Sequence, residues 1–261
     1  MDLQIKDRTA LVTGSTAGIG LAIAERLAAE GALAILCGRN QAKLDAAADR
    51  VGRVGACRAI LADPATAGGA ARLIEAVPEV DILVNNLGIY EAKPFTSISD
   101  ADWHHIFEVN VVSGARLARH YFPKMLERSW GRVIFVASES ALLIPAEMVH
   151  YGMTKTAQLA VARGLAEQTR GTGVTVNSVL PGPTRSEGVA AFIASVIPDE
   201  GATPEQRETL FFERMRPLSL IRRLIEPEEI AAYVAFLASP LSAVTNGAAI
   251  RVEGGIVPTI A

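Results

Sequence analysis

The stretch TALVTGSTAGIGLAI, residues 9–23, joins three signals that together decide the fold of this chain. An apolar run at 10–13 favours a buried strand, and Ile19, Ile23 and Leu27 recur at the spacing of one helix face. Between them lie three glycines in the pattern G-x-x-x-G-x-G, rather than the commoner G-x-G-x-x-G. Glycines at such a turn let the chain reverse sharply, let backbone amides approach a pyrophosphate, and let the helix pack closely on the strand. We expect a dinucleotide-binding turn, with a purely structural turn as the alternative.

Outward from this turn, short apolar runs alternate with helical patterns. The expected strands are 10–13, 32–37, 56–61, 82–85, 132–137, 174–179 and 248–252. The expected helices are 18–30, 41–50, 65–75, 100–126, 148–170 and 227–237. Several of the strand candidates are continuously apolar, which is typical of strands covered on both faces. The alternation predicts an α/β fold, a three-layer, doubly wound, Rossmann-like parallel sheet of about seven strands with helices on both faces.

The alternation stops between residues 185 and 225. This segment offers helical patterns at 189–197 and 205–214 around a turn-like 198–204, but no strand. In this fold class, a long insertion after the carboxyl end of a strand lies where ligands bind. We expect a substrate lid, with an ordinary surface excursion as the alternative. Because no Pro/Gly/Ser-rich linker divides the chain, we expect residues 1–261 to form one domain.

Composition restricts the functional classes. The 261 residues are 50% hydrophobic and 20% charged with a net charge of -3, which argues against disorder and against a nucleic-acid-binding surface. The chain has no apolar stretch long enough for a membrane span, and its N-terminus does not resemble a signal peptide. We expect a cytoplasmic protein in which Cys37 and Cys57 are buried free thiols.

Four polar residues stand at positions where catalysis is expected. Tyr151 and Lys155 are four residues apart on a predicted helix, so they share one face. Ser138 directly follows the predicted strand 132–137, at the sheet edge where ligands bind. Asn110 lies in an otherwise apolar helix, where asparagine has poor propensity. Each residue has an ordinary alternative: an exposed helix pair, a turn cap, or a buried amide that satisfies backbone groups.

Together with the glycine turn, these residues make the chain resemble the short-chain dehydrogenase/reductase family, in its single-domain branch. The resemblance covers nearly the whole chain. The matching motifs are TGSTAGIG at 13–20, NNLG at 85–88, Ser138, YGMTK at 151–155, PG at 181–182 and the helix residue Asn110. One departure is Leu87, which stands where that family usually has alanine.

The resemblance implies hydride transfer that interconverts a carbonyl and a secondary alcohol. Tyr151 would be the general acid and base, and the positive charges of Lys155 and of the oxidised cofactor would lower its pKa from about 10. Ser138 would stabilise the substrate oxygen, Lys155 would also hold the ribose hydroxyls, and Asn110 would fix a water that links Lys155 to solvent. Two other classes stay open: a dinucleotide-binding sensor or scaffold without turnover, and a lyase-type enzyme on the same fold.

The same resemblance implies which residues contact the cofactor. They are Gly14, Ser15, Gly18, Ile19, Gly20, Arg39, Asp63, Asn86, Gly88, Tyr151, Lys155, Pro181, Gly182 and Thr184. After the second predicted strand, Gly38 stands where an acidic residue would repel a 2′-phosphate, and Arg39 follows it. Because arginine pairs bidentately with phosphate, NADP(H) is the preferred cofactor, with NAD(H) as the alternative. Asp63 is expected to contact the adenine, to cap the helix that follows it, or both.

The residues that flank the motifs predict a mainly apolar carbonyl or alcohol substrate. They are Glu139, Ser140, Leu142, Leu143, Ile144, His150, Ile89 and Tyr90, with Glu139 expected to aim away into the sheet. No metal site is expected, because the adjacent His104 and His105 lack partners at zinc-ligand spacing. The resemblance implies a homotetramer or a homodimer, and the apolar stretch 254–261 supports a subunit contact.

Overall fold

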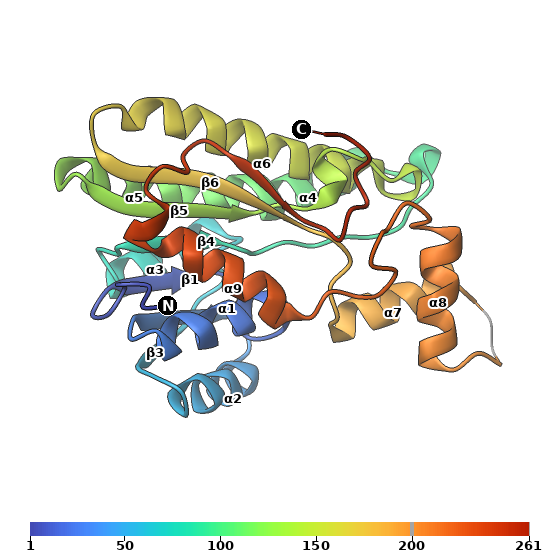
Figure 1. Cartoon of the computed structure of the whole chain (residues 1–261), viewed down its shortest axis with the longest axis horizontal. Coiled ribbons are helices and arrows are strands. Elements are labelled where there is room, and N and C mark those ends of the chain that lie inside the picture. The colour runs from blue at the N-terminus through green and yellow to red at the C-terminus, as the bar shows by residue number, and fades with distance from the viewer. Residues whose placement is uncertain (199–200, 261) are drawn as a thin grey trace.

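The computed structural model of the chain describes residues 1–198 and 201–260 and shows a sheet of seven parallel strands (Figure 1). The strands are β1 (Thr9–Val12), β2 (Leu33–Gly38), β3 (Cys57–Leu61), β4 (Ile82–Asn85), β5 (Trp130–Val136), β6 (Gly173–Pro181) and β7 (Ala249–Val252). They pair in the order β3-β2-β1-β4-β5-β6-β7, so the direction of winding reverses between β1 and β4. The predicted strands are confirmed to within two residues at either end. Ligands bind at such a reversal, outside the carboxyl ends of the strands.

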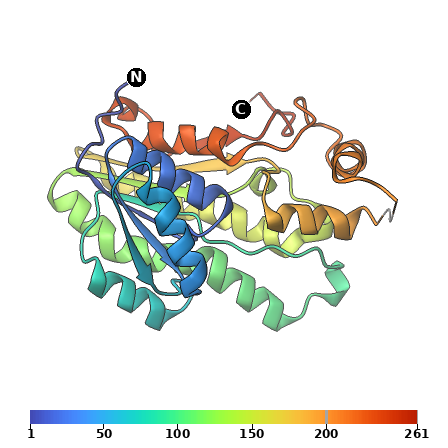
Figure 2. The ribbon, with the colours of Figure 1, turned by 90° about the horizontal axis from the view of Figure 1, so that it is seen from below.

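Helices cover both faces of the sheet (Figure 2). On one face lie α1 (Gly18–Ala29), α2 (Gln41–Gly52) and α9 (Pro227–Ala238), and on the other lie α3 (Ala67–Ala76), α5 (Ser113–Glu127) and α6 (Val149–Ala166). Successive strand residues alternate between the two cores: Val12 and Val84 join the first, and Leu11 and Leu83 the second. Burial on both faces explains the continuously apolar strands and confirms the predicted fold class.

The segment predicted as one helix, 100–126, is two helices joined by a distorted turn. Helix α4 (Asp100–Phe107) begins with a capping box, in which the Ser99 and Asp102 side chains bind each other's backbone N–H groups. A π-helical turn at Glu108–Val112 then leads directly into α5. Such turns are rare and frequently lie at functional sites. This one carries Asn110, which is 1% exposed.

Two helices interrupt the alternation after β6, α7 (Glu187–Val196) and α8 (Pro204–Arg214), and they project from one end of the layered body (Figure 1). They confirm the helices predicted at 189–197 and 205–214, while residues 199 and 200 of the predicted turn lie outside the described residues. A small core of their own joins Ile193, Ile197, Phe211, Phe212 and Leu224. The two ends of the segment meet, because the N–H of Arg185 donates to the carbonyl of Ile225 at 2.8 Å.

One expectation about a side chain is wrong, and the alternative interpretation of another is excluded. Cys37 is buried and free as predicted, but Cys57 is only partly buried, because it lies on the edge strand β3. Asp63 does not cap α3: the N-cap is Thr66, and Asp63 accepts instead from the N–H of Ala65, at 3.1 Å, in the preceding turn.

The C-terminal stretch is partly buried against its own chain. Ile256 and Val257 are buried, whereas Ile260 is exposed, and residue 261 lies outside the described residues. The burial of Ile256 and Val257 within the same chain leaves Pro258 and Ile260 as the exposed apolar residues of the stretch on which a subunit contact was predicted. Across residues 1–198 and 201–260, no helix is long and apolar enough to cross a membrane.

Candidate active site

A cavity of about 840 Å³ runs from the glycine turn to Tyr151, past the carboxyl ends of the central strands. Its wall contains most of the predicted site residues: Gly14, Gly18, Ile19, Gly20, Asn86, Gly88, Ser138, Tyr151, Pro181, Gly182 and Thr184. Five others lie outside the wall: Ser15, Arg39, Asp63, Asn110 and Lys155. The volume is within the range of small-molecule and cofactor sites.

The glycine turn has a backbone that other residues would not adopt easily. Gly14 and Gly18 have φ angles of 63° and 53°. A Cβ at Gly20 would lie 2.3 Å from the carbonyl oxygen of Gly14, so the start of α1 touches the turn directly. Ala17, the N-cap, makes no side-chain bond to the first amides of α1, which leaves these donors free for an anionic ligand. The turn therefore fits the pyrophosphate of a dinucleotide.

Thr13 ties this turn to the NNLG loop after β4. Its hydroxyl oxygen accepts from the backbone N–H groups of Asn86, at 2.9 Å, and of Leu87, at 3.0 Å. The Asn86 amide donates back to the Thr13 carbonyl at 2.9 Å. Sequence reasoning does not single out Thr13, although its place directly before the first glycine is the available signal.

Near the glycine turn, the side chains of two predicted cofactor residues, Ser15 and Arg39, contact other parts of the protein. Ser15 is fully buried, and its hydroxyl oxygen accepts from the N–H of Cys37 at 3.0 Å, so its side chain fastens the turn to β2. The Arg39 side chain is 82% exposed, with Nη1 3.9 Å from Oδ2 of Asp63. Ser15 can therefore offer a ligand its backbone but not its hydroxyl.

The structure gives a steric reason for glycine at position 38. A Cβ there would lie 2.6 Å from Cγ2 of Thr16, so an acidic side chain would require Thr16 to move. Cations surround this end instead, because Lys43 and Arg50 of α2 line the cavity and Arg39 lies just beyond it.

Tyr151 and Ser138 meet at the other end of the cavity. Tyr151 lies in the first turn of α6, and Ser138 follows β5. The Ser138 hydroxyl donates to the carboxylate of Glu139 and accepts from the N–H of Ser140 at 3.1 Å, and it lies close enough to the Tyr151 phenol to oppose part of the rise in the phenol's pKa. Ser138 is thus both a turn cap and a site residue. Glu139 does not aim away into the sheet as expected; it lines the cavity.

Lys155 lies one helical turn beyond Tyr151 and is 4% exposed. Its Nζ donates to the Val136 carbonyl at 3.1 Å and to Oε1 of Gln158 at 3.2 Å. The Gln158 amide in turn donates to the backbone carbonyl of Asn110 at 2.6 Å. Gln158 therefore joins the Lys155 ammonium group to the backbone carbonyl of Asn110 in the π-helical turn. Sequence reasoning misses Gln158, and its position one turn after Lys155 is the only signal for it.

The Asn110 side chain holds the loop after β4. Its Oδ1 accepts from the N–H of Ile89 at 2.8 Å, and its Nδ2 donates to the Ile89 carbonyl at 2.9 Å and to the Thr154 hydroxyl at 3.0 Å. The amide group thus satisfies neighbouring polar groups, as the ordinary alternative predicts, while the backbone carbonyl faces Gln158. The π-helical turn frees that carbonyl from the regular helical pattern.

Burial dominates the titration of these groups. It raises the pKa of the Tyr151 phenol, and the Glu139 carboxylate adds to that rise. It lowers the pKa of the Lys155 ammonium to about 8, partly opposed by Glu139. The Lys155 Nζ lies 5.6 Å from the centroid of the Tyr151 ring. The protein's own groups therefore raise the Tyr151 pKa, because the phenolate would be desolvated and would face a carboxylate; the predicted lowering counts on the charge of the oxidised cofactor as well as on that of Lys155.

The substrate side of the cavity combines an aromatic wall with three polar side chains. Tyr90, Phe192 and Phe211 form an aromatic wall with edge-to-face contacts. Beside it, Glu139, Ser140 and Arg216 line the same space. Of the other flanking residues, Leu142, Leu143 and Ile144 are exposed, and neither His150 nor Ile89 lies in the wall. Sequence reasoning misses Arg216, because it reaches the cavity only through the folding of 185–225.

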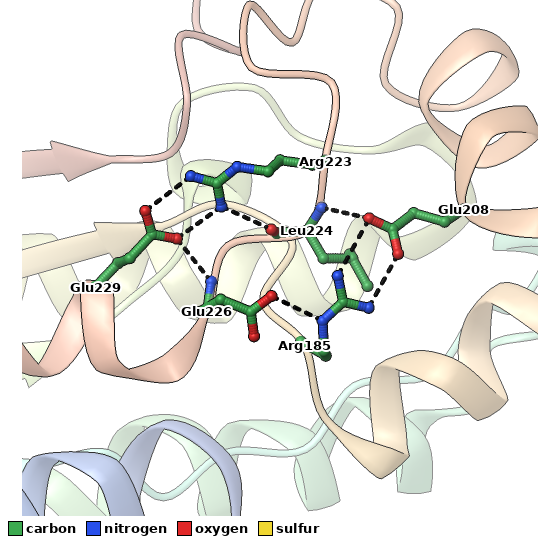
Figure 3. Close-up of polar contacts among 6 residues, drawn as sticks. All are labelled: Arg185, Glu208, Arg223, Leu224, Glu226 and Glu229. Atoms are coloured by element: carbon green, nitrogen blue, oxygen red, sulfur yellow. Dashed lines mark hydrogen bonds and ion pairs between the residues drawn. The ribbon is translucent and has the colours of Figure 1, made fainter. Parts of the chain in front are cut away.

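Ion pairs pin the base of that segment to α9 (Figure 3). Arg185 pairs with Glu208 of α8, at 3.0 Å, and with Glu226, at 2.9 Å. Arg223 pairs with Glu229 of α9 at 2.7 Å. Glu208 also accepts from the backbone N–H of Leu224 at 2.9 Å, so one carboxylate joins both ends of the segment.

No cluster of three or more His, Cys, Asp or Glu within residues 1–198 and 201–260 is placed to hold a metal ion. His104 and His105 lie on α4, and His150 packs edge to face against Trp103 with a ring-centroid distance of 5.9 Å.

Comparison with known proteins gives a consistent result. Residues 8–195 match the family described as short chain dehydrogenase. The chain is 49% identical to the uncharacterised oxidoreductase YvaG of Bacillus subtilis, over 100% of both chains. It is similar to a crystal structure of L-sorbose reductase from Gluconobacter frateurii complexed with NADPH and L-sorbose, with a TM-score of 0.93, 30% identity and 100% coverage of both chains. A 3-oxoacyl-(acyl-carrier-protein) reductase from Agrobacterium tumefaciens C58 with NADP bound gives a TM-score of 0.87 at 32% identity, covering 97% of this chain and 96% of the other.

Proposed function

Because this chain belongs to the short-chain dehydrogenase/reductase family and is an oxidoreductase, we propose that it interconverts a carbonyl and a secondary alcohol with NADP(H), using Tyr151 as the general acid and base. The observation that carries this proposal is that Tyr151 and Ser138 meet in the same cavity as the glycine turn. A substrate oxygen at Ser138 would thus share one enclosed space with a dinucleotide on the turn.

In the proposed reaction, the cofactor supplies or accepts the hydride when it is bound. Ser138 donates a hydrogen bond to the substrate oxygen and stabilises its developing charge. Tyr151 gives that oxygen a proton during reduction and removes it during oxidation. Lys155 holds its ammonium group behind Tyr151 through Gln158 and Val136, and with Asn110 and Gln158 it keeps α6 and the loop after β4 in register.

The preference for NADP(H) over NAD(H) is supported by charge and by space. Arg39, Lys43 and Arg50 gather at the end of the cavity beside β2. At position 38, the acidic side chain that would favour an unphosphorylated ribose would require Thr16 to move. The crystal structures of the sorbose reductase and of the acyl-carrier-protein reductase contain NADPH and NADP respectively.

Two features of the proposal concern the whole molecule. Residues 185–225 act as the substrate lid of one domain, since Phe192, Phe211 and Arg216 reach from them into the cavity. The enzyme works as a homotetramer or a homodimer, which sedimentation at micromolar concentration would measure.

The central test is Tyr151→Phe, assayed at 340 nm with NADPH and a panel of carbonyls. Loss of the transferable proton should lower kcat by about 100- to 10,000-fold, while NADPH binding persists. Tyr233→Phe, at an exposed tyrosine on α9, is the matched control and should keep the wild-type rate. Equal rates for Tyr151→Phe and wild type would refute the assigned mechanism. No turnover of any carbonyl or alcohol would favour the sensor class.

The cofactor preference is tested by Arg39→Asp. An aspartate should repel the 2′-phosphate, so the ratio of kcat/KM for NADPH to that for NADH should fall by about 10- to 100-fold. Arg53→Asp, at an exposed position just after α2, makes the same change of charge and should leave the ratio alone. A wild type that uses NADH as readily as NADPH would show that Arg39 does not bind phosphate.

A further inference from the structure

Glu139 and Arg216 form a buried ion pair in the wall of the cavity, next to Ser138. Glu139 is the residue after Ser138, and Arg216 follows α8 in the segment 185–225. Their side chains are 7% and 8% exposed, and Arg216 Nε lies 3.8 Å from Glu139 Oε1. Arg216 Nη1 is held from behind by Glu147 at 3.1 Å. Neither residue gives or takes the proton or the hydride in the reaction described above.

A buried ion pair at this place is a poor wall for an apolar substrate. Burying charged groups is costly unless each of their hydrogen-bonding positions finds a partner. A hydrocarbon chain pressed against Glu139 and Arg216 would displace water from both groups and give nothing in return. A substrate with its own hydrogen-bonding groups would replace that water.

The hydrogen bonds of Ser138 indicate where a hydroxyl group of such a substrate would lie. Its only proton is donated to the Glu139 carboxylate, and its oxygen accepts from the N–H of Ser140. To stabilise a carbonyl oxygen, Ser138 must aim this proton at the substrate instead. Glu139 would then lose a hydrogen bond in a buried site unless the substrate supplied another donor. Burial already raises the pKa of the Glu139 carboxyl group, so its charged form depends on such donors.

We propose that Glu139 accepts a hydrogen bond from a hydroxyl on the carbon next to the reacting carbonyl, so that the preferred substrates are small α-hydroxyketones and, in the reverse direction, vicinal diols. This inference rests on the proposed carbonyl–alcohol oxidoreductase function. The substrate hydroxyl takes the place of the Ser138 hydroxyl at Glu139, and the Ser138 proton turns to the carbonyl oxygen. The neighbouring hydroxyl is not oxidised; it only donates a hydrogen bond. Arg216 keeps the carboxylate charged and offers donors to further substrate oxygens.

The test compares matched ketone pairs with NADPH: 1-hydroxy-2-butanone against 2-butanone, and 2-hydroxycyclohexanone against cyclohexanone. The wild type should prefer the hydroxylated member by at least about 100-fold in kcat/KM, because a site built to bind a hydroxyl strongly rejects the analogue that lacks it. Glu139→Gln, which keeps the shape but removes the charge, should reduce this ratio by at least about tenfold. Glu187→Gln, at an exposed carboxylate elsewhere in the same wall, is the matched control and should leave the ratio unchanged.

A second variant keeps the test decisive if loss of one charge disturbs folding. The double substitution Glu139→Met with Arg216→Met replaces the whole buried pair with apolar side chains, a change that proteins often tolerate. Its thermal unfolding should remain cooperative, and its ratio should shift toward the plain ketones. Variants that keep the wild-type ratio would overturn the role of Glu139. A wild type that reduces plain and hydroxylated ketones equally well would overturn the inference and leave the proposed function standing. Reduction of no ketone with NADPH or NADH would overturn both.

Discussion

Different interactions stabilise the sheet body and the segment 185–225. The body buries two cores, one on each face of seven paired strands. The segment has a core of five buried side chains, and α7 and α8 pack chiefly on each other. Its base is fixed by ion pairs whose arginines, Arg185 and Arg223, are 49% and 48% exposed. Exposed ion pairs contribute about 0–1 kcal/mol each, far less than buried apolar side chains.

The two ends of the cavity differ in the same way as the body and the segment. The cofactor end is built from the tightly packed βα turn, where Gly20 leaves no room even for a methyl group. The substrate end is completed by Phe192, Phe211 and Arg216, which belong to the less well anchored segment. Elements that open locally are drawn from the regions with few buried contacts. We therefore expect a rigid cofactor site and an adaptable substrate site.

The largest combined effect, on stability and on cofactor binding together, should come from Gly20→Ala. The added Cβ would lie 2.3 Å from the Gly14 carbonyl oxygen and 2.4 Å from Nδ2 of Asn86, so the turn must open. We expect a loss of about 3 kcal/mol in the free energy of unfolding, together with loss of NADPH binding. Gly52→Ala, where a Cβ meets nothing within 4 Å, should instead stabilise the chain by up to about 1 kcal/mol. Urea unfolding and NADPH titration measure both, and similar results for the two variants would contradict a tightly packed turn.

Replacing Lys155 should change the free energy of unfolding by a smaller amount and in the opposite direction. Its pKa of about 8 lies below the ordinary 10.5, so the folded chain releases this proton before the unfolded chain does as the pH rises. The penalty for the buried charge is therefore fully present below pH 8, and stability recovers between about pH 8 and 10.5. Lys155→Met should abolish turnover yet stabilise the fold at pH 7 by up to about 3 kcal/mol, at about 1.4 kcal/mol per pKa unit.

The pH dependence of the free energy of unfolding shows whether Lys155→Met stabilises the fold by removing a buried charge or only by packing better. Denaturation of wild type and Lys155→Met at pH 7 and pH 9.5 should show a gain that narrows at the higher pH. Lys43→Met, at an exposed lysine, should change the free energy of unfolding by less than about 0.5 kcal/mol at either pH. A gain at Lys155→Met that is the same at both pH values would count against a buried charge.

The smallest global effect should come from Phe211→Ala in the core of the segment. Phe211 and Phe135 of β5 are both 1% exposed, so the two truncations are matched. Phe135→Ala should lower the free energy of global unfolding by about 3–5 kcal/mol. Phe211→Ala should lower it by less than about 1 kcal/mol, because the segment opens locally before the body unfolds. Amide hydrogen exchange in α7 and α8 should rise sharply for Phe211→Ala only; an equal global loss would show that segment and body unfold as one.

Most of the fold could be predicted because its signals are local. Each strand is a short apolar run, and each turn of the alternation carries its own glycine, proline or cap. The π-helical turn at Glu108–Val112 could not be predicted, because it depends on Asn110 meeting Ile89, Thr154 and Gln158 from other parts of the chain. The role of Ser15 could not be predicted either, because its hydroxyl binds the backbone of β2, which lies 22 residues further along the chain.

The sequence by itself determined the parallel sheet, the glycine turn and the pairing of Tyr151 with Lys155, because periodicity and motif spacing encode neighbours that are close along the chain or fixed by regular geometry. Only the tertiary structure decided what surrounds them. It placed Gln158 between Lys155 and Asn110, turned Glu139 into the cavity, and brought Arg216 to Glu139 across 77 residues of sequence (216 - 139). Charges and hydrogen bonds act between groups that folding brings together, so the polarity of the substrate side follows from packing and not from any local pattern.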